Sequence, residues 1–123
     1  MLKLMIVDDS NIIRRKIERA QQGSHIQVVA TARNGNDALA EFKKHQPDVV
    51  TMDLTMPEMD GIECIEELMK LNPETLILVI SALSDKATGI EALHKGARGF
   101  LCKPFDEEKL GNALKELTEG LHV

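Results

Sequence analysis

The sequence predicts one doubly wound α/β domain, with a five-stranded parallel sheet and five helices. Five short apolar runs alternate with five longer amphipathic segments along 123 residues, which is the pattern of parallel strands joined by helical crossovers. The runs at 49–52 and 76–80 are apolar nearly throughout, as strands covered by helices on both faces must be. Right-handed crossovers leave few topologies, and among these we expect the doubly wound strand order 2-1-3-4-5 for a chain of this length, with residues 1–123 forming a single domain.

The ten elements follow one another with little between them. The expected strands lie at 2–7, 26–32, 49–52, 76–80 and 100–102, and the expected helices at 11–21, 37–44, 62–71, 85–95 and 106–117. Ser10 is the expected N-cap of the first helix, because its hydroxyl can accept from a free backbone N–H. Asn34-Gly35 predicts a turn before the second helix, and Pro57 and Pro73 mark breaks on either side of the third. Gly89 lies inside the fourth helix and weakens it.

Composition excludes several classes of protein. Lys and Arg number 15 and Asp and Glu number 20, for a formal charge of −5, so we expect no binding to nucleic acid or to an anionic membrane. No apolar run approaches the roughly 20 residues that a membrane span needs, and no signal peptide is expected. Two cysteines form no disulfide framework, which favours a reduced, cytoplasmic setting. A chain of this length buries enough surface to fold alone, and we expect a monomer.

Polar side chains follow four of the five predicted strands. They are Asp8 and Asp9 after the first strand, Asp53 after the third, Ser81 after the fourth, and Lys103 and Pro104 after the fifth. In an open parallel sheet the ligand crevice lies beyond the carboxyl ends of the strands. In the order 2-1-3-4-5 these four strands are neighbours, spaced by about 4.8 Å. The sequence therefore places three carboxylates, a hydroxyl and an ammonium group at one edge.

This set of groups suits phosphoryl transfer. Three carboxylates repel one another unless a cation lies among them, and hard oxygen ligands favour Mg²⁺, or Mn²⁺, over zinc. Lys103 and Ser81 could bind the oxygens of a phosphate. Positioning and charge neutralisation provide most of the catalysis in phosphoryl transfer, and a carboxylate can be the nucleophile. Asp53, in the middle of the cluster, is the expected acceptor.

Each of these residues has an ordinary interpretation when taken alone. Asp8 and Asp9 could simply favour a helix N-terminus, Ser81 could be a cap, and Lys103 a surface charge; their coincidence at four strand ends favours the functional interpretation. The first helix carries four cations, Arg14, Arg15, Lys16 and Arg19. They predict a solvated face, or else a docking site for an acidic helix of a phosphotransfer partner. Cys64 and Cys102 are expected to be small buried apolar residues.

With these residues assembled, the sequence resembles the receiver domains of two-component response regulators. Four segments carry the resemblance, VDDS at 7–10, DLTMPEMDG at 53–61, SAL at 81–83 and GARGFLCKPF at 96–105. They occur in the family's order and cover essentially the whole chain. The resemblance is greatest to the stand-alone chemotaxis regulators of the CheY type.

The resemblance implies a role for each position. Asp53 accepts a phosphoryl group from a sensor histidine kinase, CheA-like, or from a phosphotransfer protein. Asp8, Asp9, Asp53 and the backbone carbonyl of Thr55 hold the metal, while Ser81 and Lys103 bind the phosphoryl oxygens. The Lys103–Pro104 peptide is cis. Phe100 swings inward once Ser81 has moved, and the face formed by the fourth helix, fifth strand and fifth helix is then read by a target, possibly the flagellar switch.

Other functions remain open at this point. The domain could be a phosphorelay intermediate, a regulator of another single partner, or an interaction module whose acidic pocket is silent. A metal-dependent phosphatase that uses an aspartyl phosphate is the enzymatic alternative; it would need a general acid at the position of Thr55. We expect no turnover of a separate substrate. Phe100 stands where many chemotaxis members have Tyr, and Leu83 flanks the expected path of the attacking water.

Overall fold

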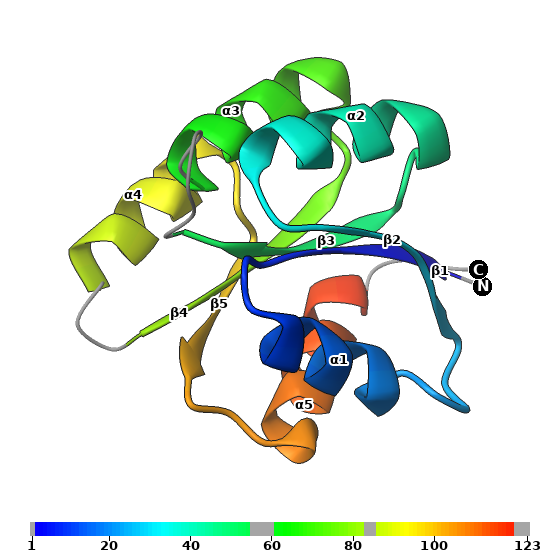
Figure 1. The fold of residues 1–123 in the computed structure, drawn as a ribbon. Helices are drawn as coiled ribbons and strands as arrows, with labels where there is room; N and C mark the ends of the chain where they lie inside the picture. The colour runs from blue at the N-terminus through cyan, green and yellow to red at the C-terminus, as the bar shows by residue number, and fades with distance from the viewer. Residues whose placement is uncertain (1, 55–60, 83–85, 120–123) are drawn as a thin grey trace.

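Five parallel strands form one sheet, which helices cover on both faces (Figure 1). The structure is a computed structural model that describes residues 2–54, 61–82 and 86–119. The strands are β1 (Leu2–Val7), β2 (Ile26–Ala32), β3 (Val49–Asp53), β4 (Leu76–Ala82) and β5 (Gly99–Lys103), and the helices are α1 (Asn11–Ala20), α2 (Gly35–His45), α3 (Gly61–Leu71), α4 (Lys86–Lys95) and α5 (Glu107–Thr118). The strand order is β2-β1-β3-β4-β5. The predicted fold class, element order and sheet topology are therefore confirmed.

The helix boundaries depend on their capping residues. Ser10 caps α1 as predicted, with its hydroxyl accepting from the backbone N–H of Ile13. Helix α2 begins two residues earlier than predicted, because Asn34 Oδ1 accepts from the backbone N–H of Asp37 at 2.8 Å and Asn34 is the N-cap. None of the helices among the described residues is long and apolar enough to cross a membrane.

Three strands extend further than their apolar residues predict. Asp53 pairs with Ile80 and so belongs to β3, while Ala82 pairs with Lys103 in the ladder between β4 and β5. The polar residues expected just beyond these strands are therefore held within the sheet itself. Ladder hydrogen bonds fix their backbone, which makes their placement more rigid than a loop would allow.

The sheet separates two hydrophobic cores. Helices α1 and α5 cover one face, and α2, α3 and α4 cover the other (Figure 1). Successive strand residues alternate between the two faces, so that Leu4 and Ile6 belong to the core under α1 and α5 and Met5 and Val7 to the opposite core. This alternation decides which functional side chains can meet.

Candidate functional site

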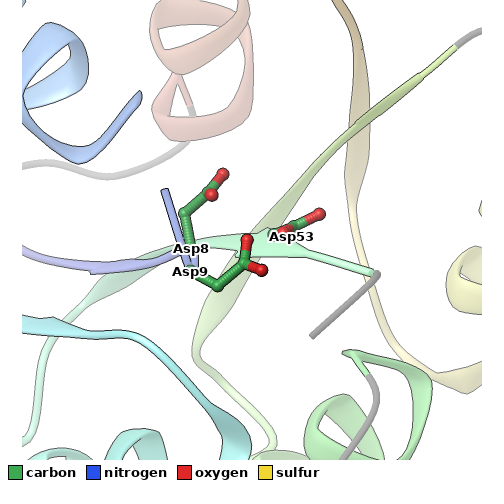
Figure 2. Close-up of side chains that lie close together, drawn as sticks. All are labelled: Asp8, Asp9 and Asp53. Carbon is green, nitrogen blue, oxygen red and sulfur yellow. The ribbon is translucent and has the colours of Figure 1, made fainter. Parts of the chain in front are cut away.

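Three carboxylates converge at the carboxyl edge of the sheet. Asp8 and Asp9 follow β1, and Asp53 ends the neighbouring strand β3 (Figure 2). Each offers a ligand oxygen that lies within 4.8 Å of the others. Asp8 is 1% exposed and Asp53 is 5% exposed, whereas Asp9 is open to solvent. The cluster thus has two buried members and one accessible member.

Lys103 brings a positive charge to this cluster. Its Nζ lies 3.0 Å from Asp8 Oδ2 and 3.7 Å from Asp53 Oδ1. Lys103 lies two residues after Leu101, which packs in the core under α1 and α5, so the alternation of β5 points it to the face that carries both acids. Buried carboxylates need such a partner, because an unpaired buried charge is strongly unfavourable. One ammonium against three carboxylates still leaves the site negative.

The position of Asp8 is fixed by several hydrogen bonds. Its Oδ1 accepts from the backbone N–H of Ser10 at 2.9 Å, and its own N–H donates to the carbonyl of Ala32 at 3.0 Å. Arg14 Nη1 donates to the Asp8 carbonyl at 2.6 Å. With Lys103 on Oδ2, both carboxylate oxygens are bonded. Asp8 is therefore preorganised and not free to change rotamer.

The donor set fits a hard divalent cation. All three members are carboxylates, and Mg²⁺ and Mn²⁺ prefer oxygen ligands whereas structural zinc sites use Cys and His. Two oxygens bound to one Mg²⁺ lie at most about 4.2 Å apart, and the three ligand oxygens already lie within 4.8 Å of one another. Asp8, Asp9 and Asp53 are the residues that would hold the ion. Thr55, expected to add its backbone carbonyl, lies outside the described residues.

Comparison with known proteins gives a consistent result. The family model described as "Response regulator receiver domain" matches residues 4–115. The chain belongs to the response regulator receiver family. The "Chemotaxis protein CheY" of Listeria monocytogenes is 39% identical over 119 residues, covering 97% of this chain and 100% of the relative. A protein-glutamate methylesterase/protein-glutamine glutaminase of Carboxydothermus hydrogenoformans is 41% identical over 98% of this chain, but the match spans only 34% of that protein.

Among solved structures, a CheX–CheY–BeF3–Mg²⁺ complex from Borrelia burgdorferi is similar to this receiver domain. The TM-score is 0.89 and the sequence identity 31%, with 94% of this chain and 88% of that chain covered. The domain is thus a CheY-like receiver of a two-component response regulator. Proteins of this kind act in signalling, and the likeness to the methylesterase concerns one part of that longer protein.

The predicted switch residues of the receiver lie on the neighbouring strands. Ser81, in β4, is 2% exposed and lies one position beyond the partner of Asp53. Ser81 continues the face of Ile77 and Val79, which pack under α2, α3 and α4, and Phe100 of β5 is partly buried against that same core. The Lys103–Pro104 peptide is cis, as the resemblance predicts. Leu83 lies outside the described residues.

The structure corrects two interpretations of the sequence. The solvated-face prediction for α1 is wrong for Arg14, which bonds the Asp8 carbonyl, and for Lys16, which bonds the carbonyl of Phe105 and lies 4.5 Å from the centroid of its ring. Arg14 follows the N-cap Ser10 by one helical turn, and this spacing alone could have indicated that its side chain reaches back to the strand end. Cys64 is buried as predicted, but Cys102 is only partly buried.

Proposed function

We propose that this receiver domain accepts a phosphoryl group on Asp53 from a phosphohistidine of a sensor kinase, in a reaction that depends on Mg²⁺. The observation that carries the proposal is the convergence of Asp8, Asp53 and Lys103, with one ammonium group 3.0 Å and 3.7 Å from the two buried acids. A site with these charges can bind a cation and a phosphate together. Residues 1–123 act as one receiver domain in this proposal.

Asp53 is the acceptor because of its position. It ends the central strand of the sheet, between Asp8, which follows β1, and Ser81 on β4. A carboxylate oxygen of Asp53 forms the new bond to phosphorus while the bond from phosphorus to the kinase histidine nitrogen breaks, and that nitrogen then takes a proton from solvent. The product is an acyl phosphate, which later loses its phosphoryl group to water.

The other residues position and neutralise the phosphoryl group. Lys103 Nζ exchanges its contact with the carboxylates for one with a phosphoryl oxygen. A charge-assisted hydrogen bond to phosphate is as favourable as the one to carboxylate that it replaces. The Ser81 hydroxyl donates to a second oxygen. Asp8, Asp9 and Asp53 would hold Mg²⁺, which would supply positive charge to offset that of the carboxylates and the phosphoryl group. Asp8, already fixed by Ser10 and Arg14, keeps the geometry of the pocket constant.

The proposed readout is the face formed by α4, β5 and α5. Phosphorylation adds a charge of about −1.5 to −2 and three acceptor oxygens. Movement of Ser81 toward them frees space under α4, which Phe100 can occupy. Ile90 and Leu93 of α4 are 57% and 43% exposed, so a change there alters an apolar surface that a target protein could bind.

The relatives favour a role in chemotaxis. CheY proteins match along nearly their whole length, at 100% for the Listeria protein and 98% for that of Thermotoga maritima. We therefore propose a CheA-like kinase as donor and a flagellar switch protein as target. We place the domain in the cytoplasm, where Cys64 and Cys102 would stay reduced. The domain would act as a monomer and turn over no substrate of its own.

Labelling with a phosphodonor tests the proposal. The purified protein, incubated with a radiolabelled small acyl phosphate and Mg²⁺, should take up close to one equivalent of label, and Asp53→Asn should take up none. Asp37→Asn, which removes an exposed acid on α2, is the matched control and should label as the wild type does. Undiminished labelling of Asp53→Asn would overturn the proposal. Sustained release of phosphate from an organic phosphate would favour the phosphatase instead, and no labelling of the wild type would favour a silent pocket.

A further inference from the structure

Gly89 lies in the middle of α4, where the backbone does not require a glycine. The glycines with positive φ among the described residues are Gly23 and Gly96; Gly89 has ordinary helical geometry within Lys86–Lys95. Glycine inside a helix is less favourable than alanine, since it loses more conformational freedom on folding. Backbone geometry therefore gives no reason for a glycine at this position.

The space at Gly89 is taken by the ring of Phe100. A Cβ added at residue 89 would lie 2.2 Å from Phe100 Cε2 and 2.6 Å from Cδ2, and real Cβ atoms essentially never come closer than 3.0 Å to a heavy atom outside their own and the neighbouring residues. The ring thus lies directly against the backbone of α4. Gly111, the glycine inside α5, differs completely, because an added Cβ there meets nothing within 4 Å.

The ring has open space on one side. An apolar hollow of about 230 Å³ lies between α4 and β5 and is lined by Gly89, Ile90, Leu93, Phe100 and Cys102. Phe100 is paired with Val79, and Cys102 with Ser81, in the ladder between β4 and β5. Since side chains two apart in a strand share a face, Phe100 and Ser81 project toward the same side of the sheet. A second ring position nearer to Ser81 would therefore not require the ring to cross the sheet.

We propose that Gly89 is a positioning residue. Because it has no side chain, the Phe100 ring has room to lie against α4, and this room sets the balance between the present ring position and one nearer Ser81. The inference rests on the proposed function, in which Ser81 and Phe100 respond to the phosphoryl group on Asp53. A methyl group at residue 89 removes the space that the ring occupies. The ring then favours the position near Ser81, and a ligand of Asp53 that stabilises that arrangement binds more tightly, because less of its binding free energy is spent on moving the ring.

Fluorine NMR on Gly89→Ala tests this directly. The chain has three phenylalanines, so uniform fluorophenylalanine labelling gives three resonances, and Phe100→Leu assigns one of them. In Gly89→Ala, without any ligand, we expect the Phe100 resonance to move toward the position that it takes in the wild type with Mg²⁺ and beryllofluoride. The half-saturating beryllofluoride concentration should fall at least threefold. Gly111→Ala makes the same change in helix propensity without a contact, and should alter neither quantity.

Several outcomes separate this inference from the proposed function. An unmoved Phe100 resonance in folded Gly89→Ala, or a moved resonance with unchanged beryllofluoride binding, would overturn the inference and leave the proposed function intact. If the wild-type resonances do not change when Mg²⁺ and beryllofluoride are added, both the proposed function and the coupling of the Phe100 ring to Asp53 are contradicted. If Gly89→Ala does not fold, the double variant Gly89→Ala/Phe100→Leu tests whether the contact with the ring is the cause. Removal of the ring should then restore folding. A double variant that stays unfolded contradicts the inference.

Discussion

The two faces of the sheet differ in how firmly they hold their functional residues. On the face of α1 and α5, Asp8 is bonded through both carboxylate oxygens, and the core residues Leu110 and Leu114 are at most 1% exposed. On the face of α4, Ile90 and Leu93 are largely exposed and a hollow lies beside Phe100. The buried acid Asp8 is held in one position, while the residues of α4 that would report phosphorylation are loosely packed.

This difference has a physical basis. Buried carboxylates must be paired and hydrogen-bonded, and meeting that requirement immobilises them. A surface that signals must have two arrangements of similar free energy, and elements with few buried apolar contacts meet that condition at low cost. Because side chains alternate along a β-strand, neighbouring strand residues can belong to different faces. One face can then hold the fixed carboxylates while the other provides a surface with two arrangements. The predictions that follow test this contrast, from the largest expected effect to the smallest.

The same substitution on the two faces should have very different effects. Leu110→Ala, in the α5 core, should lower the free energy of unfolding by about 3 kcal/mol, because it removes a fully buried side chain and leaves a cavity. Leu93→Ala on α4 should cost less than about 1 kcal/mol, since much of Leu93 is already in water. Urea denaturation followed by far-UV circular dichroism measures both. Equal losses would mean that the two faces are packed alike.

Removal of Asp8 should abolish most of the response to Mg²⁺. At a concentration tenfold above its dissociation constant, Mg²⁺ should stabilise the wild type by about 1.4 kcal/mol. Asp8→Asn should weaken Mg²⁺ binding about tenfold or more, since it takes away a fixed ligand oxygen and the partner of Lys103. Thermal melts with increasing MgCl₂ report this, and Asp37→Asn should respond as the wild type does. An unchanged response in Asp8→Asn would place the ion elsewhere.

The sequence was sufficient for the topology and for the acidic cluster. Both follow from local patterns, because apolar runs mark the strands and parallel strands bring their carboxyl ends to one edge. Long-range packing was not predictable in this way. The partner of Lys16 lies 89 residues away in sequence, and the space at Gly89 has meaning only once the Phe100 ring is known to fill it. Helix α2 was misplaced because its start depends on the Asn34 cap, not on apolar spacing.

Arg14 and Arg15 are adjacent on α1, but Arg14 is partly buried against the Asp8 carbonyl whereas Arg15 is exposed to solvent. Arg14→Ala should lower the free energy of unfolding by about 1 kcal/mol, since a charged donor to the Asp8 carbonyl is lost at a partly exposed site. Arg15→Ala removes an exposed side chain and should stay within about 0.5 kcal/mol of the wild type. Phosphoryl uptake by Arg14→Ala should also slow, because Asp8 loses a support. If both variants behave alike, the contact of Arg14 with the Asp8 carbonyl contributes nothing to the stability of the face under α1 and α5.

On the face of the sheet under α1 and α5, the hydroxyl of Thr51 is buried without a hydrogen bond to any part of the chain that the structure describes. Thr51 Oγ1 has no hydrogen-bond partner within the described residues, and Thr51 is paired with Ile6 and Leu78, both in the core under α1 and α5. Thr51→Val keeps the shape of the side chain and removes the unsatisfied group, so it should raise the free energy of unfolding by about 0.5–1 kcal/mol. Thr118→Val is the matched control, because Thr118 Oγ1 donates to the Leu114 carbonyl at 2.8 Å and its removal should give no gain. A loss of stability in Thr51→Val would show that the hydroxyl is bonded in solution. The gain should leave the beryllofluoride response unchanged, since the residue supports the strand that carries Asp53 and not the loosely packed face that reports its phosphorylation.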